Sequence, residues 1–368
     1  MIRARGKDTW QVVVYAGADP RTGRERRIRR TVHGPKKAAR DVERQLVLDA
    51  RAGTIADGQL TVKDLLEAWL EHAQPDLAVT TVYNYRRLID QRIVPELGAV
   101  KVAKLTPAAL DRYYAQLRTE LSSKTVRNVH AVLRRALNQA QRWGWISVNP
   151  ATLATPPKIV KSEIHPPSRA DVSALLATLM TTDPNFGMLV WLAAVTGARR
   201  GELCGLRWKD LDEVTGTMLI ERAVAQIGGQ TVVKATKTHQ ARRIALDETT
   251  IRLLEEHRAR VVGYADVTGV TFTADLPMFP NEHLQYLHPD TISKRYRAAA
   301  DAVGISGRLH DLRHFAATEA LAAGIPVRTV AGRLGHANPA TTHNVYAHFL
   351  EASDRSAADV LGALVAGS

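Results

Sequence analysis

The chain carries the sequence T-G-A-R-R-G-E-L at residues 196–203, H-D-L-R-H at residues 310–314 and L-G-H at residues 334–336, with Tyr346 ten residues further on. These stretches hold several cations and one phenol, but no obvious pair of carboxylates. Fixed cations suit an anionic substrate, and the planar fork of arginine binds two non-bridging oxygens of a phosphodiester at once. If the stretches converge, the sequence predicts a phosphodiester substrate.

The order of these motifs resembles the tyrosine recombinase, or phage integrase, family. The resemblance rests on T-G-x-R-x-x-E-L, H-x-x-R, L-G-H and the tyrosine, and it covers roughly residues 165–350. It implies a site-specific recombinase, the integrase of a phage or other mobile element, which cleaves and rejoins DNA strands. The implied intermediate is a 3′-phosphotyrosine with a free 5′-hydroxyl, formed without cofactor or metal.

The resemblance assigns catalytic roles to six residues of this sequence. They are Arg199, Lys237, His310, Arg313, His336 and Tyr346. The two arginines are expected to stabilise the charge that builds on the phosphate in the transition state. Glu202 is expected to buttress the site or to pack nearby.

The remaining residues of this set handle protons and the nucleophilic attack. Lys237 is expected to protonate the leaving 5′-oxygen, although Lys234 lies close to it in the sequence. His310 and His336 bind the phosphate or accept the nucleophile's proton. Tyr346 is the expected nucleophile, and because a free phenol has a pKa near 10, its attack needs a base or a strongly cationic site.

Composition sets the class of partner. The 368 residues include 50 Lys and Arg against 37 Asp and Glu, a formal net charge of +13, which favours a polyanionic partner. The single cysteine, Cys204, excludes an internal disulfide framework and a cysteine-rich zinc site. No secretory signal or membrane-spanning stretch is visible, so we expect a cytoplasmic protein. The family resemblance implies that it is associated with the nucleoid of a bacterial host.

The predicted fold class is multidomain α+β, with a small N-terminal module over residues 1–55. Strands are predicted at residues 10–15 and 24–33, followed by a helix that opens at Gly34-Pro35. Six arginines lie between Arg21 and Arg30. Such a sheet can enter a DNA major groove, and the alternative is a solvated hairpin with a charged face. The family resemblance favours a module that binds arm-type DNA sites.

Two further domains are predicted after this module. Four helical patterns over residues 60–150, with caps at Thr61 and Thr106, indicate an all-α bundle, which resembles the core-binding domain of the family. A proline-rich linker is predicted over residues 151–167. The catalytic domain, residues 168–368, is mainly helical with a small antiparallel sheet, in which strands at 231–235 and 242–246 bracket a hairpin tip at 236–240.

The expected partners follow from this assignment. They are double-stranded DNA at attachment, crossover and arm sites, other copies of the chain in a tetramer, and accessory DNA-bending or directionality factors. One alternative is a catalytically silent DNA-binding relative, and a type IB topoisomerase has the same chemistry. The pair His310 and His314 also resembles the zinc signature H-E-x-x-H, but Asp replaces Glu and Arg313 places a cation beside the metal.

Overall fold

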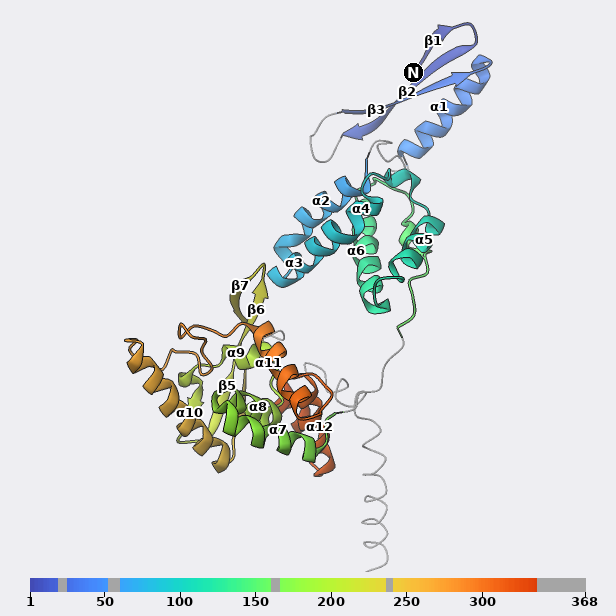
Figure 1. Cartoon of the computed structure of the whole chain (residues 1–368). Helices are drawn as coiled ribbons and strands as arrows, with labels where there is room; N and C mark the ends of the chain where they lie inside the picture. Colours follow the sequence, from blue (N-terminus) through green and yellow to red (C-terminus); the bar gives the residue numbers. More distant parts are fainter. Residues whose placement is uncertain (19–24, 52–59, 160–165, 236–240, 336–368) are drawn as a thin grey trace, which may run out of the picture. The chain divides into compact units, whose positions relative to one another are not determined.

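The computed structural model describes residues 1–18, 25–51, 60–159, 166–235 and 241–335. The chain divides into two compact units, Met1–Lys161 and Ser162–Ser368, whose parts are drawn in Figure 1. Three of the expected catalytic residues, Lys237, His336 and Tyr346, lie outside the described residues. Within the described part of the chain, no helix combines the length and apolar character needed to cross a membrane.

The first unit begins with a three-stranded antiparallel sheet and one helix that packs on it (Figure 1). The elements are β1 (Ile2–Gly6), β2 (Thr9–Ala18), β3 (Glu25–His33) and α1 (Lys36–Arg51). Val12 and Val14 of β2 are buried against Ala39 and Leu46 of α1. This confirms the predicted sheet and helix, but β1 was not predicted, because its five residues include one large apolar side chain, Ile2, and the other four residues are exposed.

A helical bundle follows in the same unit. Its helices are α2 (Val62–Ala73), α3 (Val79–Leu88), α4 (Val94–Leu97), α5 (Pro107–Leu117) and α6 (Ser123–Arg142). A π-helical turn over Ile89–Ile93 joins α3 to α4. The predicted caps are confirmed, since Thr61 and Thr106 accept hydrogen bonds from the N–H groups of Asp64 and Ala109.

The packed chain of this unit extends beyond residue 150, where the sequence places the start of the linker. Ala151 and Ala154 are buried in the core of the bundle. The Thr155 N–H donates to Asp111 at 2.6 Å, and Arg127 donates to the carbonyl of Pro157 at 3.1 Å. Pro150 opens a 3-10 turn, Pro150–Thr152, which the side chain of Asn149 caps.

The second unit is built around a buried helix, α8. Its helices are α7 (Arg169–Thr182), α8 (Pro184–Thr196), α9 (Arg200–Gly205), α10 (Glu248–Val267), α11 (Pro289–Ala302), α12 (Asp311–Ala322) and α13 (Val327–Leu334). Met188, Leu189 and Leu192 of α8 are fully buried. Because α7, α10 and α12 all pack against α8, its C-terminal end is held at a fixed place in the unit.

The described part of this unit also contains two small antiparallel sheets. β4 (Leu211–Asp212), β5 (Thr217–Ile220) and β8 (Arg242–Ala245) pair in the order β4-β5-β8, and β6 (Arg222–Ile227) pairs with β7 (Gln230–Ala235). The predicted hairpin around residues 236–240 is therefore wrong among the described strands, because β7 pairs with β6 and β8 with β5. The sequence reading missed β6, whose turn into β7 uses Gly228 and Gly229 at positive φ.

Candidate active site

The first arginine box lies at the C-terminal end of α8, in a turn that only glycine allows. Gly197 adopts the left-handed conformation, with φ +62°, and a Cβ there would lie 2.4 Å from Cδ2 of Leu334. The hydroxyl of Thr196 donates to the carbonyl of Leu192 and accepts from the N–H of Ala198. The T-G and L-G-H boxes are therefore in direct contact, although more than a hundred residues separate them in the sequence.

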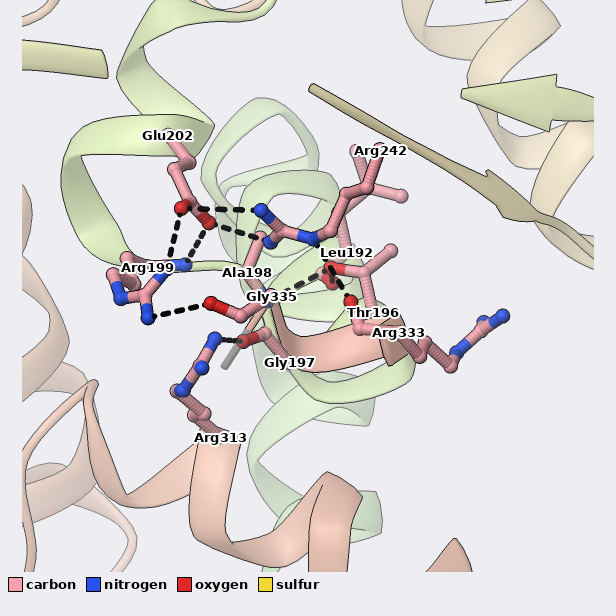
Figure 2. A network of polar contacts seen from close by, with 10 residues as sticks. All are labelled: Leu192, Thr196, Gly197, Ala198, Arg199, Glu202, Arg242, Arg313, Arg333 and Gly335. Carbon is pink, nitrogen blue, oxygen red and sulfur yellow. Dashed lines mark hydrogen bonds and ion pairs between the residues drawn. The ribbon is translucent and has the colours of Figure 1, made fainter. Parts of the chain in front are cut away.

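Arg199 leaves this turn and is held on both sides (Figure 2). Its Nη1 donates to Oε1 of Glu202 at 2.8 Å, and its backbone N–H donates to Oε2 of the same carboxylate at 2.9 Å. Its Nη2 donates to the carbonyl of Gly335 at 3.1 Å. The side chain remains 28% exposed, so an incoming anion can reach it.

Arg313 approaches the same turn from α12. It is only 4% exposed, and its Nη1 donates to the carbonyl of Gly197 at 2.7 Å. The structure thus brings together the two arginines that the sequence predicts as a clamp, because Arg313 binds the residue two positions before Arg199. The neighbouring Arg200 faces α11 instead, where it contacts Ser293 at 2.6 Å and Asp290 at 3.1 Å.

The sequence reading missed a third arginine of this network, Arg242 on β8 (Figure 2). Its Nη2 lies 2.7 Å from Oε2 of Glu202, its Nη1 lies 3.2 Å from Oε1, and its Nε donates to the carbonyl of Arg333 at 2.9 Å. Strand alternation contains a signal for it, because Arg242 lies on the same face of β8 as the buried Ile244. By the same alternation, Arg243 points to solvent.

Glu202 is the buried anion of the site, with 1% of its side chain exposed. Burial by itself raises the pKa of this carboxyl, and it is the largest single influence. The hydrogen bonds and charges of Arg242 and Arg199 together outweigh it, so the pKa of Glu202 lies below its ordinary value. Glu202 is therefore ionised at neutral pH, and the arginines around it, Arg313 included, leave the site with an excess of positive charge.

His310 lies directly before α12, with its ring in an edge-to-face contact with that of His314 at a centroid distance of 5.3 Å. Partial withdrawal from water, and then the positive potential of His314 and Arg313, lower the pKa of His310 to about 4. At neutral pH its ring is uncharged and keeps one nitrogen lone pair. In the described part of the chain, no three His, Cys, Asp or Glu side chains are grouped to hold a metal ion.

Comparison with known proteins shows which family the chain matches. Residues 169–352 match the profile described as "Phage integrase family", and residues 61–118 match "Phage integrase, N-terminal SAM-like domain". The chain belongs to the phage integrase family. It is a site-specific recombinase, and the family prediction and the predicted multidomain α+β fold class are confirmed.

Similar proteins span nearly the whole chain. A "Tyrosine recombinase XerC-like" protein of Caldanaerobacter subterraneus subsp. tengcongensis is 27% identical, over 98% of this chain and 97% of its own length. The Tn1549 transposon integrase, solved in complex with transposon right end DNA, aligns with a TM-score of 0.68 at 20% identity, over 82% of this chain and 100% of that one. A lambda integrase tetramer bound to a Holliday junction aligns with a TM-score of 0.60 at 17% identity, over 94% of each.

Proposed function

We propose that this recombinase acts on double-stranded DNA at the attachment sites of a phage or other mobile element, with Arg199 and Arg313 as the clamp on the scissile phosphate. The observation that carries the proposal is the convergence of these arginines. Arg313 is fixed on the carbonyl of Gly197, and Arg199 is fixed on the carbonyl of Gly335. Preorganised donors of this kind stabilise the charge that a phosphodiester develops in its transition state, at no cost of reorganisation during the reaction.

The proposed reaction transfers the phosphoryl group to Tyr346 and back. The phenol oxygen attacks phosphorus, the bond to the 5′-oxygen breaks, and Lys237 gives that oxygen a proton. His310 or His336 takes the proton of the phenol, and the uncharged ring of His310 has a nitrogen lone pair that can accept it. The phosphotyrosine bond conserves the energy of the phosphodiester, so the strand is rejoined without ATP.

The N-terminal module supports a second DNA contact, at arm-type sites. Val12 and Val14 face α1, so the alternate positions of the sheet face away from that helix. On this outer face Arg29 pairs with Val13 and Arg27 pairs with Tyr15, and both arginines are exposed. Exposed guanidinium groups on a narrow sheet suit the phosphates that flank a major groove.

The assembly and cellular setting are proposed on family membership. We propose that four copies act together on the DNA, a proposal supported by the lambda integrase tetramer on its Holliday junction. Accessory DNA-bending or directionality factors are proposed as partners in the bacterial cytoplasm, on the nucleoid.

The decisive test is Tyr346→Phe, assayed on a labelled, nicked suicide DNA substrate by denaturing gel and by peptide mapping of the adduct. The variant is expected to bind crossover-site DNA like the wild type and to form no covalent adduct, since only one oxygen is removed. Tyr264→Phe is the matched control, because Tyr264 lies on α10, where its hydroxyl donates to the carbonyl of Glu282. An adduct that persists in Tyr346→Phe, or that maps to another residue, overturns the assignment.

A further inference from the structure

We infer that Arg242 is a positioning residue of the recombinase site, which offsets the charge of Glu202 and so leaves the charge of Arg199 available to the phosphate. The inference rests on the proposed function, since it concerns how Arg199 acts there. The hydrogen bonds of Arg242 go to Glu202 and to the carbonyl of Arg333. Arg242 acts through Glu202 and through the end of α13.

The first step of the argument is where Arg242 sits. Its side chain is 9% exposed, and it comes from β8, directly after the segment that contains Lys237. It contacts Glu202 on α9, and the carbonyl of Arg333 on α13. One guanidinium thus joins the element that carries the first arginine box to the element that ends in L-G-H, as Figure 2 shows.

The second step is how the carboxylate is shared. Each oxygen of Glu202 accepts one hydrogen bond from Arg199 and one from Arg242: Oε1 at 2.8 and 3.2 Å, and Oε2 at 2.9 and 2.7 Å. One negative charge therefore serves two guanidinium groups, and the trio carries a net charge of +1. Without Arg242, the trio becomes a neutral Arg199–Glu202 pair, which binds a phosphate anion more weakly.

The third step is the close packing at Gly335. A Cβ at this residue would lie 2.8 Å from Nη1 of Arg242, while the Gly335 carbonyl accepts from Arg199 at 3.1 Å. Arg333 adds a brace of its own, because its guanidinium donates to the carbonyls of Ala245 at 3.0 Å and Val195 at 3.1 Å. The side chain of Arg242 therefore also restrains the backbone position of Gly335, the residue before His336.

The neighbouring Arg243 is a matched control. It is exposed on the other face of β8, and the hydrogen bond that it donates, to the hydroxyl of Thr217, is long at 3.4 Å. It has the same charge as Arg242 and lies one residue away on the same strand. If the loss of any cation from β8 slowed cleavage, Arg242→Gln and Arg243→Gln would be slowed alike. An effect that requires Glu202 is expected in Arg242→Gln alone.

The experiment measures single-turnover cleavage of the suicide substrate by the full-length protein at saturating DNA, with DNA affinity and thermal unfolding followed separately. Arg242→Gln is expected to slow cleavage about 100-fold, as loss of alignment in a catalytic site does, with little change in DNA affinity. The double variant Glu202→Gln with Arg242→Gln removes the uncompensated carboxylate as well, and it is expected to cleave about tenfold faster than Arg242→Gln. Arg243→Gln is expected to cleave within about twofold of the wild type.

Two further readouts separate charge compensation from a merely structural role. Loss of the Arg242 cation raises the pKa of Glu202, so the rate of Arg242→Gln relative to the wild type is expected to recover as the pH is lowered from neutral. Arg242→Lys keeps the charge but not the fork, and it is expected to lie between the wild type and Arg242→Gln. If Arg242→Gln does not fold, Arg242→Lys decides, with an expected loss of about tenfold.

The outcomes that overturn the inference are specific. They are a double variant no faster than Arg242→Gln, a relative rate that does not change with pH, or a folded Arg242→Lys with the wild-type rate. Failure of the proposed function is distinguishable, because it would be seen in the wild type as an adduct that does not map to Tyr346.

Discussion

The N-terminal sheet and the active site are both rich in arginine, yet they use it in opposite ways. On β3, the Arg27 side chain is 59% exposed and pairs with Glu25 of the same strand. In the second unit, the Arg242 side chain is 9% exposed and Arg313 is 4% exposed, and both donate to backbone carbonyls of distant segments. Burial and bonding, rather than residue type, distinguish the exposed arginines that we propose to attract DNA from the fixed arginines that we propose for the reaction site.

The two groups of arginines differ in the step at which each side chain becomes ordered. A buried arginine bonded to carbonyls and to Glu202 is ordered on folding, so its geometry is ready before substrate arrives. An exposed arginine is ordered only on binding, and its contribution is a salt-dependent attraction to phosphate. Fixed cations are therefore expected to control rate, and exposed cations to control affinity.

The largest effect is expected from Arg313→Ala, which removes a fixed cation. Loss of an arginine that stabilises phosphoryl-transfer charge lowers the rate by about 10³ or more. Single-turnover cleavage at saturating DNA measures it, and DNA affinity is expected to change far less. A loss of rate smaller than about tenfold, or one that weaker DNA binding explains, would contradict the contrast between fixed and exposed arginines.

A smaller effect, on stability, is expected from Glu202→Ala. Removing one partner of a buried ionic network leaves Arg242 without its carboxylate, which costs about 3 kcal/mol of unfolding free energy. Urea denaturation at neutral pH measures this loss. Glu213→Ala is the control, since Glu213 pairs with Arg258 at the surface, and its loss is expected to cost no more than about 1 kcal/mol. Equal losses in the two variants would contradict the contrast between buried and exposed pairs.

The same carboxylate predicts a dependence of stability on pH. The folded-state pKa of Glu202 lies below its ordinary value of 4.5, so the native state binds fewer protons than the unfolded state. Its stabilisation is complete above pH 4.5 and is lost as the pH falls through the lowered folded-state pKa. Unfolding free energies measured across this acid range are expected to fall more steeply for the wild type than for Glu202→Gln. Parallel curves would show that the carboxylate gains nothing from the arginines.

The smallest effect on stability is expected from the double variant Arg27→Ala with Arg29→Ala. Both side chains are exposed, so the unfolding free energy is expected to change by no more than about 0.5 kcal/mol. The plot of log affinity against log salt concentration for arm-site DNA is expected to become shallower by about 1.8, which corresponds to two phosphate contacts. An unchanged slope would favour a solvated hairpin without a role in DNA binding.

Much of the fold could be predicted from local signals. The caps at Thr61 and Thr106 each place a helix start correctly, because a side-chain oxygen before an apolar helical pattern is a local feature. The pairing of β7 with β6 was missed although its signal is local, since Gly228-Gly229 is a two-residue hairpin turn between the two strands. A hairpin inferred from two neighbouring strands carries no information about a third.

The active site likewise has one part that the sequence predicts and another that it does not. The proximity of Arg199 and Arg313 could be predicted, because both residues belong to motifs that follow one another in the order typical of the family. The role of Arg242 could not, because its partners, Glu202 and the carbonyl of Arg333, lie on separate elements that only the folded chain brings together. Arg242 and Arg243 are adjacent residues of the same type. Only the burial of Ile244, which lies on the same face of β8 as Arg242, indicates which of the two arginines points inward.

The contact between Arg199 and Gly335 also constrains how the protein is made. It joins residues 136 positions apart, and Arg333 reaches Val195 across 138. Contacts of such sequence separation cost loop-closure entropy and slow folding. During translation, a chain that has not yet emerged as far as residue 335 lacks this support for Arg199. The hydrogen bond that fixes Arg199 can therefore form only after most of the second unit has been synthesised.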